Sequence, residues 1–324
     1  MRDPIVVDIT DNSSVGEVRR LATASGRRIG LPDEVTERIA LVATEMATNV
    51  VKHASEGLFL IGKDDGAGDK LELLALDNGP GIVDLARAMT DGHSTSGTPG
   101  TGLGAVSRHA GFFQIYSRPK HGTAVLSRFG GSGTAAREGA VSVPFHGEEV
   151  NGDGWGAKAV NGTRSVMVVD GLGHGQSAHE AAVAACTAFK NAKGHPTDVM
   201  TTVHDALRPT RGAAVAISEM SGNTLRFCGV GNISATIIDA TARRSAVSLH
   251  GIVGHQMREA REFTYPWSSD STLIMHSDGI GTRWDLDAYP GLLGRDAVLI
   301  AAVLWKDHRR HNDDSTVVVS QAAP

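Results

Sequence analysis

Residues 43–54 read Ala-Thr-Glu-Met-Ala-Thr-Asn-Val-Val-Lys-His-Ala, and the first half of the chain is built around this stretch. Glu45, Asn49 and His53 are spaced four residues apart, so on a helix their side chains project from one face, with Lys52 beside them. A solvated helix face would explain this spacing by itself. The sequence that follows points instead to a binding site.

Two glycine-rich loops come after this helix. Residues 77–82 read Asp-Asn-Gly-Pro-Gly-Ile after a strand-like run, and residues 100–104 read Gly-Thr-Gly-Leu-Gly before a helical run. Glycines at alternating positions let the backbone approach a ligand, and a helix N-terminus offers free N–H groups to phosphates. Each loop alone is typical of an ordinary turn. Together with the polar helix, they predict a nucleotide pocket.

The second half of the chain places aspartates in four separated glycine-rich or polar contexts. Three of these contexts lie at or beside the ends of predicted strands, where carboxylates from distant segments can converge on divalent cations. A single Asp-Gly pair is more typical of a plain turn. The joint pattern predicts a metal site formed by segments 151–155, 168–171, 277–279 and 312–316.

Composition narrows the classes of function. The 324 residues include 31 Lys and Arg against 36 Asp and Glu, a formal charge of −5 that lacks the basic footprint of a nucleic-acid binder. No apolar run approaches the roughly 18 residues needed to span a bilayer, and the first residues lack a signal pattern. Two cysteines, Cys186 and Cys228, are too few for a disulfide framework. We therefore expect a cytoplasmic protein without nucleic-acid or membrane partners.

The length predicts about two domains. The stretch 130–139 has the composition of a flexible connection, which places a linker at 131–140 between domains at 1–130 and 141–324. The first domain is expected to be an α/β layer with one functional helix. Strand-like runs with paired helices dominate the second domain, so the fold class predicted for the chain is α+β.

The polar helix and the two loops, taken in order, resemble the GHKL (Bergerat) ATPase fold over about residues 5–130, an α/β sandwich. Within this fold, the amino-acid sequence of residues 43–49 is most similar to that of the anti-sigma-factor serine kinases of the RsbT/RsbW group. The resemblance implies an ATP-dependent kinase that acts on a protein serine or threonine. Glu45 is the expected general base, because a base must lie close to the transferred phosphoryl group.

The same resemblance implies roles for the remaining residues of the pocket. Asn49 would hold Mg²⁺ on the ATP phosphates, and Asp77 would accept a hydrogen bond from the adenine amino group. Lys52 or His53 would add positive charge. The glycines would give room for the base (Gly79 and Gly81) and form the phosphate lid (Gly100, Gly102 and Gly104).

The second half resembles the SpoIIE-type branch of the PPM metal-dependent serine/threonine phosphatases, closest to RsbX, over about residues 141–322. The resemblance rests on Asp-Gly-Leu-Gly-His-Gly at 170–175, Gly-Val-Gly-Asn at 229–232, His-Ser-Asp-Gly-Ile at 276–280 and Asp-Asp-Ser-Thr at 313–316. It implies an α-β-β-α sandwich with two Mn²⁺ or Mg²⁺ ions, which activate water for in-line attack on phosphorus.

This second resemblance also implies a ligand set. Asp170 would bridge the two ions, and Gly171 would offer its backbone carbonyl. Asp278 and Asp313 would complete the shell of one ion, and Asp153 would be a ligand directly or through water. Asp314 would contact the ligand residues rather than the ions. A histidine in a loop, such as His174, more often forms local hydrogen bonds than binds a metal ion. The first segments of the phosphatase half contain no obvious arginine to bind the substrate phosphate, and Arg164 is only a candidate by its position in the sequence.

The two resemblances together predict a bifunctional kinase and phosphatase for bacterial stress signalling by partner switching. The expected substrates are STAS-domain proteins, either anti-sigma antagonists or stressosome components, and a sigma factor or downstream regulator is a further expected partner. An alternative makes the first half an ATP-binding module that sequesters a sigma factor or STAS partner, fused to a phosphatase or a phosphatase-like sensor. The charge balance and the lack of accessory domains disfavour DNA topology, repair and chaperone roles.

Overall fold

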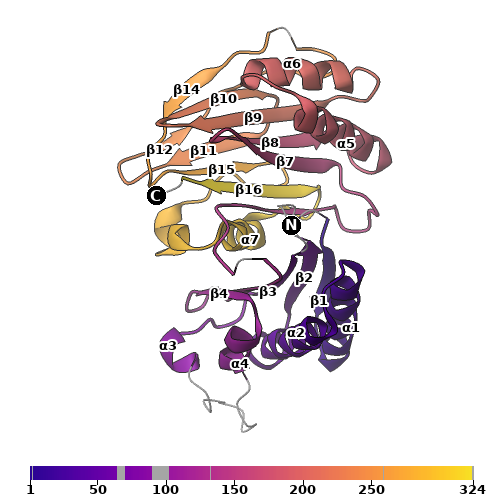
Figure 1. Cartoon of the computed structure of the whole chain (residues 1–324), viewed down its shortest axis with the longest axis vertical. Helices are drawn as coiled ribbons and strands as arrows, with labels where there is room; N and C mark the ends of the chain where they lie inside the picture. The colour runs from indigo at the N-terminus through magenta and orange to yellow at the C-terminus, as the bar shows by residue number, and fades with distance from the viewer. Residues whose placement is uncertain (2, 64–69, 90–101, 132, 258, 323–324) are drawn as a thin grey trace. The chain divides into compact units, whose positions relative to one another are not determined.

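The computed structural model describes the chain except for residues 2, 64–69, 90–101, 132, 258 and 323–324. It divides into two compact units (Figure 1). Unit 1 contains Met1, Asp3–Ala136 and Asp285–Val303, and unit 2 contains Arg137–Trp284 and Leu304–Pro324. Both units combine helices with sheets, which confirms the predicted α+β class. Among the helices in the described ranges, none is long and apolar enough to cross a membrane.

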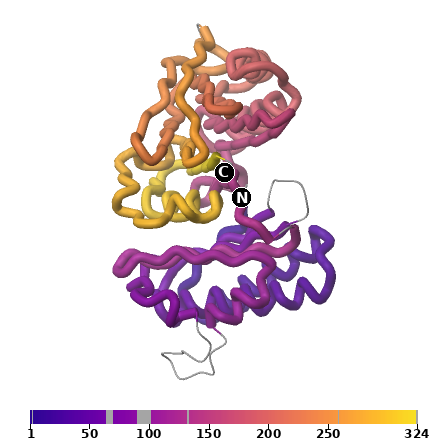
Figure 2. Tube along the Cα trace, turned by 60° about the vertical axis from the view of Figure 1, so that its left-hand side comes forward, coloured from indigo at the N-terminus to yellow at the C-terminus, as the bar shows by residue number. Residues whose placement is uncertain are grey.

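Unit 1 is built on a five-stranded antiparallel sheet with the strand order β1-β2-β3-β5-β4. Helices α1 and α2 lie together on one face of this sheet (Figure 2). The short helices α3 and α4 follow β3 in the chain. The elements are β1 (Ile5–Ile9), α1 (Asn12–Arg28), α2 (Asp33–Ala54), β2 (Gly57–Lys63), β3 (Leu71–Asp77), α3 (Leu85–Ala88), α4 (Gly102–His109), β4 (Phe112–Ser117) and β5 (Thr123–Phe129).

Helix α2 is placed by its apolar stripe. Val42, Met46 and Val50 recur every four residues and are buried in the core of unit 1. Asp33 and Glu34 occupy its first turn, where the helix dipole favours acidic residues. Because the buried stripe is fixed against the sheet, the neighbouring positions that include Asn49 and His53 are directed to the edge of the core.

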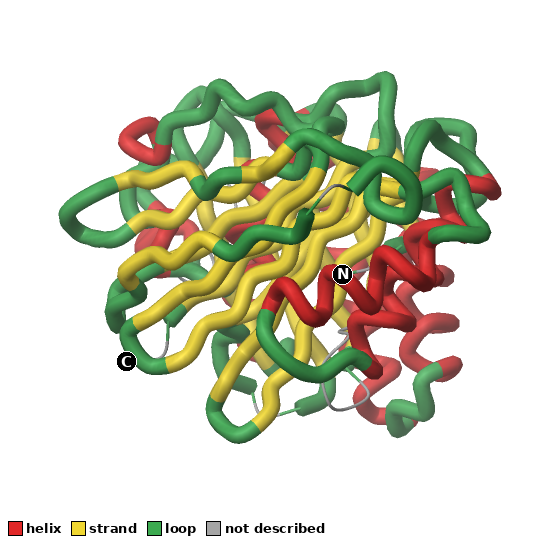
Figure 3. The backbone as a smooth tube through the Cα atoms, turned by 90° about the horizontal axis from the view of Figure 1, so that it is seen from above, coloured by secondary structure: helices red, strands yellow, loops and turns green. Residues whose placement is uncertain are grey.

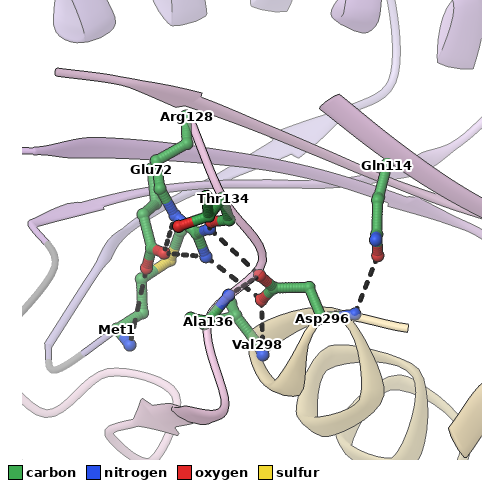
Figure 4. A network of polar contacts seen from close by, with 8 residues as sticks. All are labelled: Met1, Glu72, Gln114, Arg128, Thr134, Ala136, Asp296 and Val298. Atoms are coloured by element: carbon green, nitrogen blue, oxygen red, sulfur yellow. Dashed lines mark hydrogen bonds and ion pairs between the residues drawn. The ribbon is translucent and has the colours of Figure 1, made fainter. Parts of the chain in front are cut away.

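A segment distant in sequence completes unit 1. Asp285–Val303 contains the short helices η1 (Leu286–Ala288) and η2 (Leu292–Gly294) and the first turns of α7 (Ala297–His308). Asp296 lies just before α7 and forms hydrogen bonds with Arg128 of β5, and its backbone N–H donates to Gln114 of β4 at 2.8 Å (Figure 4). The sequence analysis did not predict α7, because its residues are apolar on every face and show no helical periodicity.

Unit 2 is a sandwich of two sheets. One sheet has the order β13-β10-β9-β8-β7, with β14 paired to β10, and the other has the order β12-β11-β15-β16-β6. Its strands are β6 (Glu138–Val143), β7 (Asp153–Val160), β8 (Thr163–Gly171), β9 (Ala213–Ser221), β10 (Thr224–Val230), β11 (Ser234–Ile238), β12 (Arg243–Ser245), β13 (Ser248–Leu249), β14 (Phe263–Pro266), β15 (Thr272–His276) and β16 (Ser315–Gln321). Residues 138–140, expected within a linker, therefore belong to β6, which pairs with β16.

Two apolar layers hold this sandwich together. Side chains such as Trp155, Val168 and Met275 fill the space between the sheets. Helices α5 (Gln176–Asn191) and α6 (Pro196–Leu207) cover the outer face of the sheet that contains β8 and β9, with Phe189 buried beneath them. The strands run side by side with these helices outside them (Figure 3). The strand ends that leave the sandwich carry the predicted aspartates.

Candidate functional sites

Unit 1 contains a cavity of about 500 Å³ beside helix α2. Its described wall comes from α2, the end of β3, the loop that follows β3, helix α3, the start of α4 and strand β5. Four residues predicted for the nucleotide site line it, and so does His53. These four are Asn49, Asp77, Gly81 and Gly102.

Asn49 supplies the most informative atom of this wall. Its amide nitrogen is buried and has no hydrogen-bond partner among the described residues. A buried polar atom left without a partner costs about 1–3 kcal/mol, so such atoms are retained where a ligand satisfies them. The two ends of an amide are assigned from their hydrogen bonds, so either the oxygen or the nitrogen of Asn49 can face the cavity. An amide oxygen in this position suits Mg²⁺.

Asp77 is held at the end of β3 by backbone donors. Its Oδ1 accepts hydrogen bonds from the N–H of Gly79 at 2.8 Å and of Thr123 at 3.2 Å. The loop is tight: a Cβ on Gly81, which has φ +68°, would overlap the carbonyl oxygen of Arg118, and a Cβ on Gly79 would lie 2.7 Å from the Cβ of Ala54. Packing within the chain therefore explains why both positions are glycine, without a ligand.

The other residues predicted for this pocket are dispersed. Glu45 is half-buried one turn before Asn49, and Lys52 is exposed. The described wall of the cavity includes neither side chain. Gly104 is buried within α4, and Gly100 falls outside the described residues.

Unit 2 gathers aspartates at one end of its sandwich. Asp153 and Asp170 lie directly opposite each other on the antiparallel strands β7 and β8. Asp278 follows the end of β15, and Asp313 precedes the start of β16, its antiparallel neighbour. The Ser277 hydroxyl donates to Asp153 Oδ2 at 2.6 Å and so joins the two sheets at this point.

The carboxylates of this cluster affect one another's pKa. Burial raises the pKa of Asp170, and the negative charges of Asp153, Asp278, Asp313 and Asp314 raise it further. Burial also raises the pKa of Asp153, although hydrogen bonds from Ser277 and Thr316 oppose this shift. Each carboxylate therefore disfavours ionisation of its neighbours.

These carboxylates do not form a coordination shell by themselves. Within the described parts of the chain, no group of three or more His, Cys, Asp or Glu side chains is positioned to hold a metal ion. The donor set nevertheless suits a hard divalent cation, because it consists of carboxylate oxygens that repel one another and that a cation would neutralise.

Asp314 fixes the loops around the cluster. Its two oxygens accept hydrogen bonds from the N–H of Phe145 at 2.8 Å and of Gly152 at 3.0 Å. Gly279 packs against the backbone here, because a Cβ on it would overlap the carbonyl oxygen of Asp314. Asn232 donates to Asp278 Oδ2 at 2.8 Å. These contacts give Asp314 and Asn232 supporting positions.

The loop after Asp170 carries Gly171 and His174. A Cβ on Gly171 would overlap the carbonyl oxygen of Ala178, so this backbone lies against the start of α5. His174 Nδ1 forms a hydrogen bond with Glu148 at 2.6 Å. Sequence reasoning missed Ser277 and Asn232 although both lie in quoted motifs, and nothing in the sequence marked Glu148.

Comparisons with known proteins assign a family to each half of the chain. Residues 10–128 match the family model described as "Histidine kinase-like ATPase domain", and residues 161–322 match "Stage II sporulation protein E (SpoIIE)". The chain is 32% identical over 126 residues to the serine/threonine-protein kinase RsbT of Bacillus subtilis, covering 39% of this chain and 95% of that protein.

We describe two of the solved structures that resemble the chain. The first, described as "The bacterial stressosome: a modular system that has been adapted to control secondary messenger signaling", is 26% identical with a TM-score of 0.54 and covers 57% of this chain and 98% of its own. The second, RsbX in complex with magnesium, is 22% identical with a TM-score of 0.50 and covers 56% and 92%. At that identity, the second likeness shows the fold alone.

The first part of the chain is a histidine kinase-like ATPase domain, and the second half is a SpoIIE domain. The chain belongs to the SpoIIE family through its second half, and its first part belongs with the RsbT kinases.

Proposed function

We propose that this chain both adds phosphate to and removes phosphate from serine or threonine residues of a regulatory protein. The observation that carries the proposal is the presence, on one chain, of a cavity lined by the unsatisfied amide of Asn49 and of an acidic cluster around Asp170. The first site suits ATP and the second suits divalent cations.

In unit 1, the chain's own residues bind and orient ATP. Asp77 accepts a hydrogen bond from the adenine amino group, and Asn49 holds the Mg²⁺ that accompanies the phosphates. Gly102, at the start of α4, presents backbone near the phosphates, where a helix N-terminus favours negative charge. Glu45 is the base that accepts the proton of the substrate hydroxyl, which requires its side chain to reach the cavity.

In unit 2, the aspartates hold two Mn²⁺ or Mg²⁺ ions, which make water nucleophilic near neutral pH and neutralise phosphate charge. Asp170 and the carbonyl of Gly171 would hold the ions from β8. Asp278 and Asp313 would bind from the second sheet, and Asp153 would bind from β7. Ser277 and Asn232 orient two of these carboxylates through the hydrogen bonds described above.

The proposed substrates are STAS-domain proteins of partner-switching pathways. The similarity to RsbT and the likeness to a stressosome structure support this class. A kinase and a phosphatase on one polypeptide would set the forward and reverse rates for one substrate.

The kinase is tested by incubating the full chain with γ-labelled ATP, Mg²⁺ and STAS proteins from the same genome. We expect label on serine or threonine for the unaltered chain and for Thr48→Ala, a neighbour on α2, and at least about a hundredfold less for Glu45→Gln. Unchanged phosphate transfer by Glu45→Gln would show that Glu45 is not the general base. The absence of transfer to any STAS protein would contradict the proposed kinase activity.

The phosphatase is tested by hydrolysis of p-nitrophenyl phosphate with Mn²⁺. We expect turnover that requires the metal and is lost in Asp170→Asn, whereas Asp205→Asn, at an exposed site on α6, retains it. Turnover that persists in Asp170→Asn would contradict the assigned centre.

A second candidate for unit 1 is an ATP-binding module that sequesters a sigma factor or a STAS protein. The observation that favours it is the absence of Glu45 from the described wall of the cavity. Stable partner binding in the presence of ATP, without phosphate transfer, would support this candidate over the kinase.

A further inference from the structure

A cationic side chain beside the metal positions of a phosphatase can orient the phosphate of the substrate. Asp170 interacts electrostatically with Asp153, Asp278, Asp313 and Asp314, and the negative charge of this cluster disfavours the approach of a phosphate dianion. Arginine is the side chain best suited to the task, because its planar guanidinium donates two parallel hydrogen bonds to phosphate oxygens.

The structure excludes Arg164 from this task. Arg164 lies six residues before Asp170 on the extended strand β8, a separation of about 20 Å. It is also engaged, because its Nη1 lies 3.4 Å from Glu138 Oε1.

Arg211 lies next to the loop that follows Asp170. Strand β9 begins two residues after Arg211 and pairs with β8, so that Ala213 is opposite Gly171 and Ala214 is opposite Asp170. Its Nη1 is 3.5 Å from the position that a Cβ on Gly173 would take. The guanidinium therefore reaches the loop 171–174 rather than the body of the sheet.

This loop lies on the acidic cluster. The carbonyl oxygen of Gly173 is 3.5 Å from the position of a Cβ on Gly152, and the N–H of Gly152 donates to Asp314. The ring of the next residue, His174, lies 5.9 Å from that of Phe145 between centroids and is tilted by 59° to it, and the N–H of Phe145 also donates to Asp314. A group that touches Gly173 is thus at the rim of the cluster.

The backbone on both sides of Arg211 is fixed, while its side chain is available. The Gly212 N–H donates to the Thr210 hydroxyl at 3.0 Å, and the Gly212 carbonyl accepts from the Leu172 N–H at 3.1 Å. Arg211 itself is exposed, and its guanidinium has no hydrogen bond or ion pair with any described residue. Nearby Arg208, in contrast, is paired with Asp205 at 3.1 Å.

We propose that Arg211 binds the phosphate group of the phosphoserine or phosphothreonine substrate. The proposal rests on the phosphatase function proposed for unit 2. Arg211 would hold two phosphate oxygens at the rim while the ester phosphorus faces the metal positions. It would contribute mainly to substrate binding, because its contact is made before the reaction begins.

Two measurements on the full chain test this role. The first is hydrolysis of a phosphoserine peptide with Mn²⁺, and the second is calorimetric binding of inorganic phosphate to the protein saturated with Mn²⁺. We expect Arg211→Ala to raise KM and the dissociation constant for phosphate about ten- to a hundredfold, with a smaller change in kcat. Arg211→Lys, which keeps the charge but loses the fork, should give an intermediate loss.

Arg208→Ala is the matched control, since it removes an exposed arginine three residues away and should leave both constants unchanged. The affinity for Mn²⁺ should be the same in all four proteins, because Arg211 is assigned no contact with the metals. Phosphate binding by Arg211→Ala equal to that of the unaltered chain would overturn the proposal, and so would an unaltered chain that binds no phosphate. If the unaltered chain binds phosphate through Arg211 but shows no turnover, the phosphatase function fails and the phosphate site stands.

Discussion

Arg128 and Asp296 are 168 residues apart in the chain and form a two-bond ion pair inside unit 1, at 3.0 and 3.1 Å. The guanidinium also donates from Nε to Glu72 at 2.7 Å. The three side chains are at most 4% exposed. Burial alone would lower the pKa of Arg128, but the hydrogen bonds and charges of Asp296 and Glu72 raise it, so the guanidinium stays charged. This network fastens Asp285–Val303 to the sheet of unit 1.

Replacing Arg128 should destabilise unit 1. Arg128→Ala leaves the buried Asp296 without its cation and Glu72 with only the Met1 ammonium, 3.9 Å away, and breaking such a pair costs about 3–5 kcal/mol. All four tryptophans belong to unit 2, so urea unfolding followed by circular dichroism and by tryptophan fluorescence separates the two units. The exposed pair Arg208 and Asp205 is the control, because its loss should cost less than about 1 kcal/mol. If Arg128→Ala destabilises the protein no more than loss of the Arg208–Asp205 pair does, water molecules replace the lost hydrogen bonds of the network.

Replacing Asn49 should separate ligand binding from stability. Its buried amide nitrogen lacks a partner in the described structure, so Asn49→Ala removes an unsatisfied group and should leave the free energy of unfolding unchanged within about 1 kcal/mol. The same change should weaken binding of ATP with Mg²⁺ about tenfold or more, measured by calorimetry. Thr48→Ala should preserve the affinity. Equal affinities in Asn49→Ala and the unaltered chain would place the nucleotide elsewhere.

Mn²⁺ should raise the thermal stability of unit 2, and Asp170 should be required for this effect. Clustered carboxylates repel one another, and a cation bound only to the folded state stabilises it by mass action. Asp170→Asn replaces a buried carboxyl whose ionisation its neighbours disfavour with a neutral amide of the same shape, so without metal its melting temperature should equal or exceed that of the unaltered chain. Differential scanning fluorimetry with and without Mn²⁺ measures both effects. A shift with Mn²⁺ that persists in Asp170→Asn would contradict the assignment.

Gly279 and Gly281 provide a test of how the cluster is supported. A Cβ on Gly279 would overlap the Asp314 carbonyl, whereas a Cβ on Gly281 would meet only ordinary contact, 3.5 Å from the His308 carbonyl. Gly279→Ala should therefore destabilise unit 2 by about 1–3 kcal/mol and weaken Mn²⁺ binding, and Gly281→Ala should do neither. Tryptophan fluorescence during urea unfolding measures the first effect. Equal behaviour of the two variants would show that the backbone yields at Gly279.

The sequence predicts what is periodic or local in this molecule. The spacing of Val42, Met46 and Val50 defines α2 and thereby the side on which Asn49 lies. The fold class and the two families follow from motifs that each lie within a few consecutive residues. Glu45 shows the limit, because its position on the helix does not determine whether its side chain reaches the cavity.

Long-range contacts could not be predicted in this way. Nothing near Asp296 in the sequence indicates that its partner is Arg128, and α7 shows no period because it is apolar on all faces. Arg211 lies outside every quoted motif, and only the pairing of β8 with β9 brings it to the loop after Asp170. The candidate ligand residues could therefore be proposed from local motifs, whereas the residues that position them could not.

The assignment of Asp285–Val303 to unit 1 affects how this protein can be divided. A gene fragment that stops at residue 136 would encode the ATPase sheet without Asp296, one of the two carboxylates that pair with Arg128, and a fragment that starts there would contain residues 285–303 without the sheet that they contact. Replacing either half with that of a homologue at a single junction would likewise separate the Arg128 and Asp296 of one protein. An exchange of unit 1 between homologues must therefore include residues 285–303 together with residues 1–136, or supply residues 285–303 as a separate peptide.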